Sequence, residues 1–92
     1  MIDNSGRPRL SSEARLRFDR HLQRYLLLNP ESGVLLSGNA ASIVQLCTGE
    51  NTVADIVVHL SGAQNGAKRA EVERDVHAFL GELVERLFVR MD

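Results

Sequence analysis

The chain is short and close to electrically neutral, which limits what it can be. Its 92 residues carry 11 Lys and Arg against 12 Asp and Glu, and 43% of them are hydrophobic. These values are typical of one soluble globular domain, and they make a deep enzyme cleft between two lobes improbable.

Cysteine usage and the N-terminal residues indicate the compartment. A single cysteine, Cys47, excludes an internal disulfide and a multi-cysteine metal site. The first residues contain no apolar stretch typical of a signal peptide, and no run approaches the roughly 20 apolar residues of a membrane span. We therefore expect one cytoplasmic domain over residues 1–92, away from membranes, with residues 1–8 flexible.

Positive charge is concentrated near the start of the chain. Residues 1–24 contain six Arg and three acidic residues, whereas residues 25–67 contain neither Lys nor Arg. Such a segment could meet an acidic partner or nucleic acid. Because the Arg are scattered, a solvated strand face explains them without any partner.

Three strands are expected before residue 38. Residues 14–19 alternate apolar and charged side chains, which is typical of a half-buried strand. Residues 23–28 and 33–37 flank a turn that contains Pro30 and Gly33. These two segments are apolar at consecutive positions, so both of their faces are apolar. The short connections favour an antiparallel meander.

Three helices are expected to follow. Asn39 is expected to cap the first helix, and Gly49 to end it. Thr52 and Asp55 predict a capping box at the start of the second helix. Residues 61–70 are expected to form a polar loop, residues 71–87 the longest helix, and residues 88–90 an extended end.

Together these elements predict an α+β fold. It is a three-stranded antiparallel sheet followed by three helices, which is winged-helix-like, with the helices on one side of the sheet. Three helices can cover one sheet face, but they leave the edge of the third strand free. That edge offers unpaired N–H and C=O groups to another chain.

The sequence predicts neither catalysis nor a metal or cofactor. His21, His59 and His77 fall on separate elements without metal-ligand spacing, and Cys47 falls on the buried stripe of a helix. DNA binding is also not expected, because the second helix carries no Lys or Arg with which to face phosphates.

An ordered set of short segments nevertheless resembles a known family, that of pyrroloquinoline quinone (PQQ) biosynthesis protein D, PqqD. No single segment is specific, but their order from about Arg7 to Val89 is. The segments are Arg7-Pro8-Arg9-Leu10, residues 14–19, Leu28, Pro30-Glu31, Leu36, residues 40–47, Gly49, residues 52–56, residues 72–76 and Phe79-Leu80.

The resemblance implies a binding function. Members of the family are peptide chaperones and the prototype of the RiPP recognition element, which binds the leader of a ribosomally made precursor peptide. They bind the precursor peptide PqqA and present it to the radical SAM enzyme PqqE. The peptide adds as a strand beside strand three and packs against helix three, a mode called β-augmentation.

A peptide-binding site follows from this resemblance, although the sequence alone does not separate core from contact residues on the helix. Three other roles stay open: recognition of another leader peptide, a winged-helix DNA-binding regulator, and a homodimer formed through the edge strand or by exchange of helix three. The expected site residues are Gly33, Val34, Leu35, Leu36 and Ser37 at the edge, with Val72, Asp75, Val76, Phe79 and Leu83 on the helix.

Overall fold

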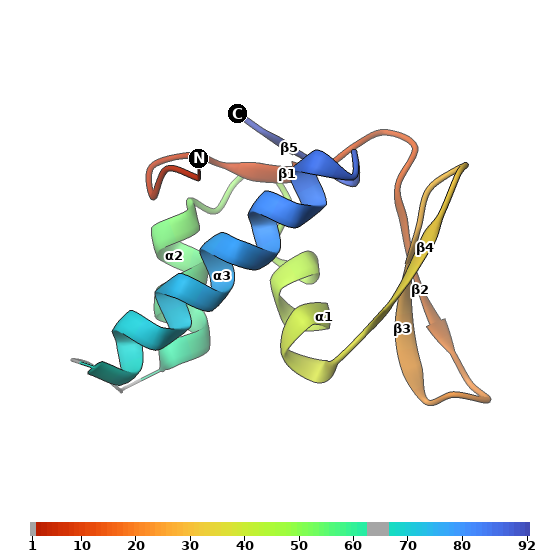
Figure 1. The fold of residues 1–92 in the computed structure, drawn as a ribbon, viewed down its shortest axis with the longest axis horizontal. Helices are drawn as coiled ribbons and strands as arrows, with labels where there is room; N and C mark the ends of the chain where they lie inside the picture. The colour runs from red at the N-terminus through yellow and green to blue at the C-terminus, as the bar shows by residue number, and fades with distance from the viewer. Residues whose placement is uncertain (1, 63–66) are drawn as a thin grey trace.

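The computed structural model describes residues 2–62 and 67–92 and has the predicted α+β architecture (Figure 1). The three strands and three helices occur in the expected order, and two short strands were not predicted as a pair. The elements are β1 (Pro8–Leu10), β2 (Arg15–Asp19), β3 (Arg24–Leu28), β4 (Gly33–Leu36), α1 (Gly38–Gln45), α2 (Val53–Ser61), α3 (Ala67–Glu85) and β5 (Val89–Met91).

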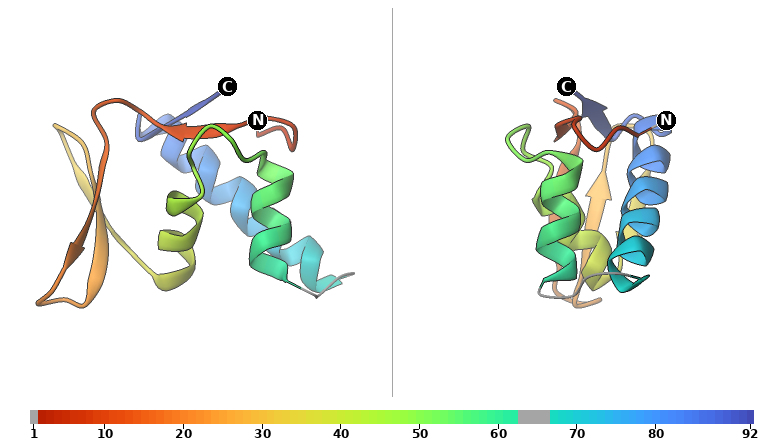
Figure 2. Two further views of the ribbon diagram at one scale, coloured as in Figure 1. Left: turned by 180° about the vertical axis from the view of Figure 1, so that it is seen from behind. Right: turned by 90° about the vertical axis from the view of Figure 1, so that its left-hand side faces the viewer.

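Strands β2, β3 and β4 form an antiparallel meander with β3 in the middle. The register pairs Leu16 with Leu27 and Leu27 with Val34, so these side chains share one face. Leu27 is fully buried, whereas Leu26 on the opposite face is only half-buried. The helices all lie on one side of this sheet (Figure 2), and Leu27 faces them because it belongs to the same buried cluster as their side chains. We call that side the inner face and the other the outer face.

The hydrophobic core lies between the inner face and the three helices. Each of its side chains contributes about 1.5–3 kcal/mol by leaving water. Helix α1 is the helix that packs directly on β3 and β4, and α3 packs on α2. The winged-helix description fits this arrangement loosely. Core side chains at or below 2% exposure include Leu27, Leu36, Val44, Ile56, Leu80 and Phe88.

The helix N-termini follow capping rules, with one correction. The predicted capping box of α2 is confirmed: Thr52 Oγ1 accepts from the Asp55 N–H, and the Asp55 carboxylate accepts from the Thr52 N–H. This backbone hydrogen bond, followed by the one to the Thr52 side chain, holds the pKa of Asp55 below its ordinary value. Ser37, rather than the predicted Asn39, caps α1 by accepting from the Ala40 N–H.

A two-stranded antiparallel ribbon, β1 with β5, joins the two ends of the described chain. Pro8 is fully buried, and the N–H groups of Val53 and Ala54 donate to the carbonyls of Gly6 and Asn4. The segment expected to be flexible therefore contacts the start of α2 and β5. Its flexibility in solution stays a prediction.

Helix α3 differs from its prediction at both ends. It begins at Ala67 rather than at residue 71, and it ends at Glu85 rather than at residue 87. Of the predicted 61–70 loop, residues 63–66 lie outside the described part of the chain. Within the described ranges, no helix is both long enough and apolar enough to cross a membrane.

Candidate functional site

Strand β4 is an edge strand with free backbone groups. In the β3–β4 hairpin the Asn29 N–H donates to the Ser32 carbonyl, and antiparallel pairs alternate from there between hydrogen-bonded and non-bonded. Val34 and Leu36 are thus bonded to β3. The N–H and C=O groups of Gly33 and Leu35 face the open side of β4.

The last predicted edge residue, Ser37, is engaged by the following helix. Its hydroxyl oxygen accepts from the Ala40 N–H, and its carbonyl accepts from the Ala41 N–H. The free part of the edge is therefore the strand itself, and Ser37 marks its junction with α1. Capping chemistry at this junction fixes the direction in which α1 leaves the sheet.

The predicted residues of α3 divide into core and surface. Val76 and Leu83 are each 1% exposed and belong to the core. Val72 and Phe79 are half-buried against it, and Asp75 is exposed. A helix stripe predicts which residues share a side, but only the structure shows which of them reach the surface.

A small hollow brings three of these α3 residues together with the other two helices. Its volume is about 120 Å³. Sequence reasoning missed the contributions of α1 and α2, since Ile43 and Leu60 lie on apolar helix stripes and Asn39 was interpreted as a helix cap. The lining residues are Asn39, Ile43, Leu60, Val72, Asp75 and Val76.

Helix α1 lies between β4 and α3, and β4 and α3 occupy the same side of the molecule (Figures 1 and 2). An extended segment added to the free edge of β4 would therefore run beside α3 with α1 beneath it. We call the free edge together with the accessible α3 residues the β4–α3 surface: Gly33, Leu35, Val72, Asp75 and Phe79. Of the other predicted edge residues, Val34 and Leu36 are bonded to β3, and Leu36 is 2% exposed and belongs to the core.

Asn29 ties the β3–β4 turn to the end of α3 and so sets the separation of β4 and α3. Its Nδ2 donates to the Arg86 carbonyl at 3.3 Å, while its Oδ1 accepts from the Glu31 and Ser32 N–H groups at 3.0 and 2.8 Å. This role was not predictable beyond the ordinary preference of Asn for turns.

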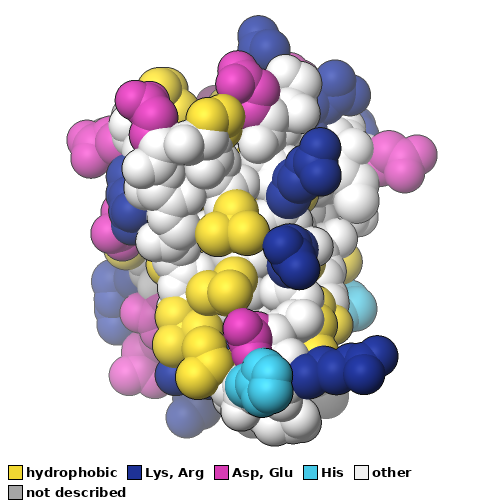
Figure 3. Space-filling model, turned by 90° about the vertical axis from the view of Figure 1, so that its right-hand side faces the viewer, with side chains coloured by type: hydrophobic (Ala, Val, Ile, Leu, Met, Phe, Trp, Pro, Cys, Tyr) yellow, Lys and Arg dark blue, Asp and Glu magenta, His cyan; other side chains and the backbone are white. Residues whose placement is uncertain are grey.

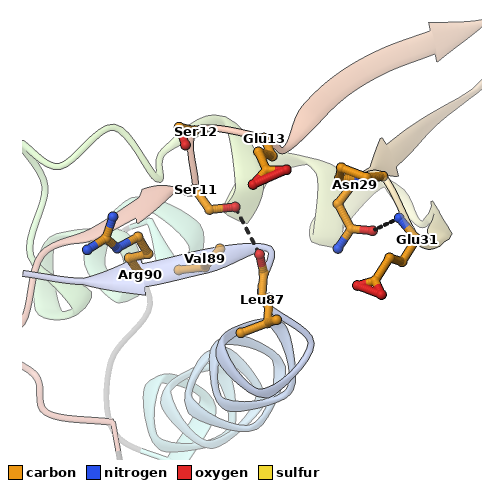
Figure 4. Close-up of a pocket in the computed structure, with 9 residues that line it drawn as sticks. Ser11, Ser12, Glu13, Asn29, Glu31, Leu87, Val89 and Arg90 are labelled. Carbon is orange, nitrogen blue, oxygen red and sulfur yellow. Dashed lines mark hydrogen bonds between the residues drawn. The ribbon is translucent and has the colours of Figure 1, made fainter.

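A second hollow, of about 430 Å³, has Asn29 among its lining residues (Figure 4). It is lined by the segment before β2, the β3–β4 turn and the end of α3, and Ser11 Oγ donates to the Leu87 carbonyl at 2.9 Å. Leu87 is 69% exposed beside it. The polar lining of this hollow includes Ser11, Ser12 and Glu13, and its apolar lining includes Leu87 and Val89.

Side chains that could hold a metal ion do not gather in the described part of the chain. No three His, Cys, Asp or Glu side chains in residues 2–62 and 67–92 are arranged to hold a metal ion. Cys47 is 4% exposed, and burial raises the pKa of its thiol to about 12. A thiol with so high a pKa is a core side chain rather than a nucleophile.

Comparisons with known proteins agree with the fold. Residues 24–89 match the sequence model of the family described as "Coenzyme PQQ synthesis protein D (PqqD)". A "PqqA binding protein" of Rhodopseudomonas palustris (strain TIE-1) is 39% identical over 88 residues, which cover 96% of this chain and 85% of that protein. A protein of the same name from Xanthomonas oryzae is 31% identical and covers 98% and 97%.

A solved structure extends the comparison to three dimensions. The solution NMR structure of the PqqD truncation of Methylobacterium extorquens PqqCD, described as a stand-alone RiPP recognition element, matches with a TM-score of 0.80. It is 31% identical and covers 98% of this chain and 95% of that one. The fold, the free edge of β4 and the similarity to this solved structure together define a small α+β domain of the recognition-element class. Within that class, the chain belongs to the PqqD family.

Proposed function

We propose that this chain is a peptide chaperone of PQQ biosynthesis. It binds the precursor peptide PqqA by strand addition at β4 and presents it to the radical SAM enzyme PqqE. The names of its relatives, which include "PqqA binding protein", support the peptide as ligand. No nucleic acid takes part in this function, because α2 has neither Lys nor Arg to offer phosphates.

The observation that carries the proposal is the free edge of β4 beside α3. Gly33 and Leu35 together supply two N–H and two C=O groups, and each net backbone hydrogen bond contributes about 0.5–1.5 kcal/mol. Val72 and Phe79 supply apolar surface for peptide side chains, each worth about 1.5–3 kcal/mol when buried. Micromolar affinity requires about 8 kcal/mol after the cost of ordering the peptide, which this surface can reach.

The buried members of the predicted site act through the core. Val76 lines the hollow from its floor, and Leu83 holds α3 against the other helices. Asp75 is exposed at the rim of the hollow and can accept hydrogen bonds from a peptide. In this proposal the chain binds and positions, and the chemistry belongs to the enzyme that receives the peptide.

Calorimetric titration with PqqA tests the proposal through two proline variants. Leu35→Pro removes an N–H from the free edge of β4, whereas Phe18→Pro removes one from β2, on the opposite edge of the same sheet. We expect Leu35→Pro to weaken binding about tenfold or more, corresponding to 1.4 kcal/mol or more. Phe18→Pro should bind like the parent chain.

Leu35→Ala serves as the matched side-chain control, because it keeps the N–H and shortens a side chain on the outer face. It should weaken peptide binding less than Leu35→Pro does, because it removes only side-chain contact with the added strand and keeps the backbone hydrogen bond. If folded Leu35→Pro and Phe18→Pro chains bind PqqA equally well, the β4 edge is not part of the peptide-binding site. If the parent chain does not bind PqqA but binds another leader peptide, the protein belongs to a different ribosomal-peptide pathway.

Self-association is expected to use the same edge. A free edge strand can pair with a second copy of itself, so saturating PqqA should shift a concentrated sample toward the monomer. Light scattering at several protein concentrations, with and without peptide, measures this. A dimer that persists at saturating peptide would show that pairing, or a helix exchange, uses another surface.

A further inference from the structure

The outer face of the three-stranded sheet is apolar at its centre and basic at one side. Leu26 and Leu28 are half-buried there, and Leu35 is 41% exposed. The register places Arg17 opposite Leu26 and Arg15 opposite Leu28, with both Arg exposed. Figure 3 shows this end of the molecule, where hydrophobic side chains form a column with Lys and Arg along its right side, and with Asp and Glu at its top and mixed with basic side chains on its left. No described element covers this column.

The charges on this face are not balanced by the described residues. At the hairpin end Asp19 lies opposite Arg24, but Arg24 Nε donates to the Leu36 carbonyl and the Asp19 carboxylate accepts from the Leu22 N–H. Arg15 and Arg17 make no ion pair with any residue that the structure describes. Two copies stacked face to face would bring two net positive surfaces together, which disfavours self-pairing here. A partner surface with apolar groups at its centre and carboxylates at its rim would match this face instead.

The face is also continuous with the proposed peptide site. Successive side chains of a strand point to opposite faces, so a peptide added to β4 would place every second side chain on the outer face beside Leu35. A protein docked on this face would then touch the chain and the peptide at once. The inner-face side chains of the same peptide would stay turned toward α1 and α3.

We propose that the outer face of β2-β3-β4 is the docking surface for the enzyme that receives the peptide, through an apolar patch rimmed by carboxylates. This inference rests on the proposed function and adds the surface by which delivery occurs. Apolar contact at Leu26, Leu28 and Leu35 supplies the attraction, and Arg15 and Arg17 set orientation and association rate.

Charge reversal on the complete chain tests the proposal with PqqE as the probe. Arg15→Glu combined with Arg17→Glu should weaken PqqE binding about tenfold or more, and the corresponding double Gln variant should fall between it and the parent. The matched control is Lys68→Glu combined with Arg69→Glu, which changes the net charge equally at exposed positions of the first turn of α3. We expect that control to bind PqqE like the parent.

Peptide affinity, measured by calorimetry on the same variants, separates the two proposals. The Arg15 and Arg17 variants should keep PqqA affinity within about twofold, because both residues lie on β2, away from the β4 edge. PqqE binding is measured with and without PqqA, so a chain that binds PqqE but not PqqA refutes the proposed function and leaves the docking surface standing.

Three results would overturn the docking surface. The first is unchanged PqqE binding in the doubly reversed variant, with its fold confirmed by circular dichroism. The second is equal weakening in the control at Lys68 and Arg69, which would mean that net charge alone decides. The third is a dimer of the parent chain that the Arg15 and Arg17 reversals dissociate, which would make the outer face an interface between copies.

Discussion

The end of α3 offers a sharp test of backbone energetics. The Leu87 N–H donates to the Val84 carbonyl and the Phe88 N–H to the Leu83 carbonyl, which is the pattern of a Schellman motif. The position after the C-cap in that motif is left-handed and usually glycine, but here it is Leu87 with a φ of 66°. We predict that Leu87→Gly stabilises the chain.

The magnitude follows from two opposing contributions. A left-handed conformation costs an L-residue about 1–2 kcal/mol, and glycine removes that cost. Glycine loses about 0.5–1 kcal/mol more conformational free energy on folding. The free energy of unfolding should therefore rise by about 0.5–1 kcal/mol, or by about 2–8 °C in Tm for a domain of this size.

Thermal and urea denaturation measure the effect, with Leu87→Ala as the control. The Leu87 side chain is 69% exposed, and both variants remove it, so the difference between them isolates the backbone. Leu87→Ala keeps the strain and should be no more stable than the parent. If Leu87→Gly is not more stable than Leu87→Ala, the assignment of strain to this residue is wrong.

Three further predictions concern α2 and the core thiol. Thr52→Ala should lower the free energy of unfolding by about 1 kcal/mol through loss of the cap, as measured by urea denaturation. Because the pKa of Asp55 is lowered in the folded chain, its contribution to stability is present above its ordinary pKa of 3.8 and should fade as pH falls through the folded value. Asp55→Asn should therefore flatten the acid dependence of Tm. Cys47 has a folded pKa of about 12 against an ordinary 9.0, so it should react with thiol reagents at pH 8 only after urea unfolds the chain. The stability of the folded chain should fall as pH rises above 9, because the unfolded thiol ionises first. Rapid native labelling, or Tm values that do not change with pH in these ranges, would contradict the last two.

Local patterns predicted the parts of the fold that depend on local chemistry. The alternation over residues 14–19 became β2, and Thr52 with Asp55 became the capping box of α2. The β1–β5 ribbon was not predicted as a pair because its strands are three residues long and pair across nearly the whole chain. The end of α3 was placed too late because Leu87, unlike glycine, carries no signal for a left-handed position.

The candidate site was predictable in outline but not in detail. Consecutive apolar residues in β3 and β4 indicated an uncovered face, and the order of strands indicated a free edge over residues 33–37. Only the register showed that its free backbone groups belong to Gly33 and Leu35. The stripe on α3 could not distinguish buried Val76 from half-buried Phe79, because both lie on one side of the helix. That distinction depends on how α1 and α2 pack, which periodicity does not encode.

The ribbon between β1 and β5 has a consequence for the order in which the chain folds. Leu10 pairs with Val89, whereas Leu28 pairs with Gly33 across a tight turn. Closing the longer loop costs about 2 kcal/mol more entropy, at about 0.6 kcal/mol per doubling of loop length. We therefore expect the β3–β4 hairpin to form early and the ribbon to close late. Pro8 lies in β1 and enters the core with the ribbon, so we expect the β4 edge to exist before the molecule is complete.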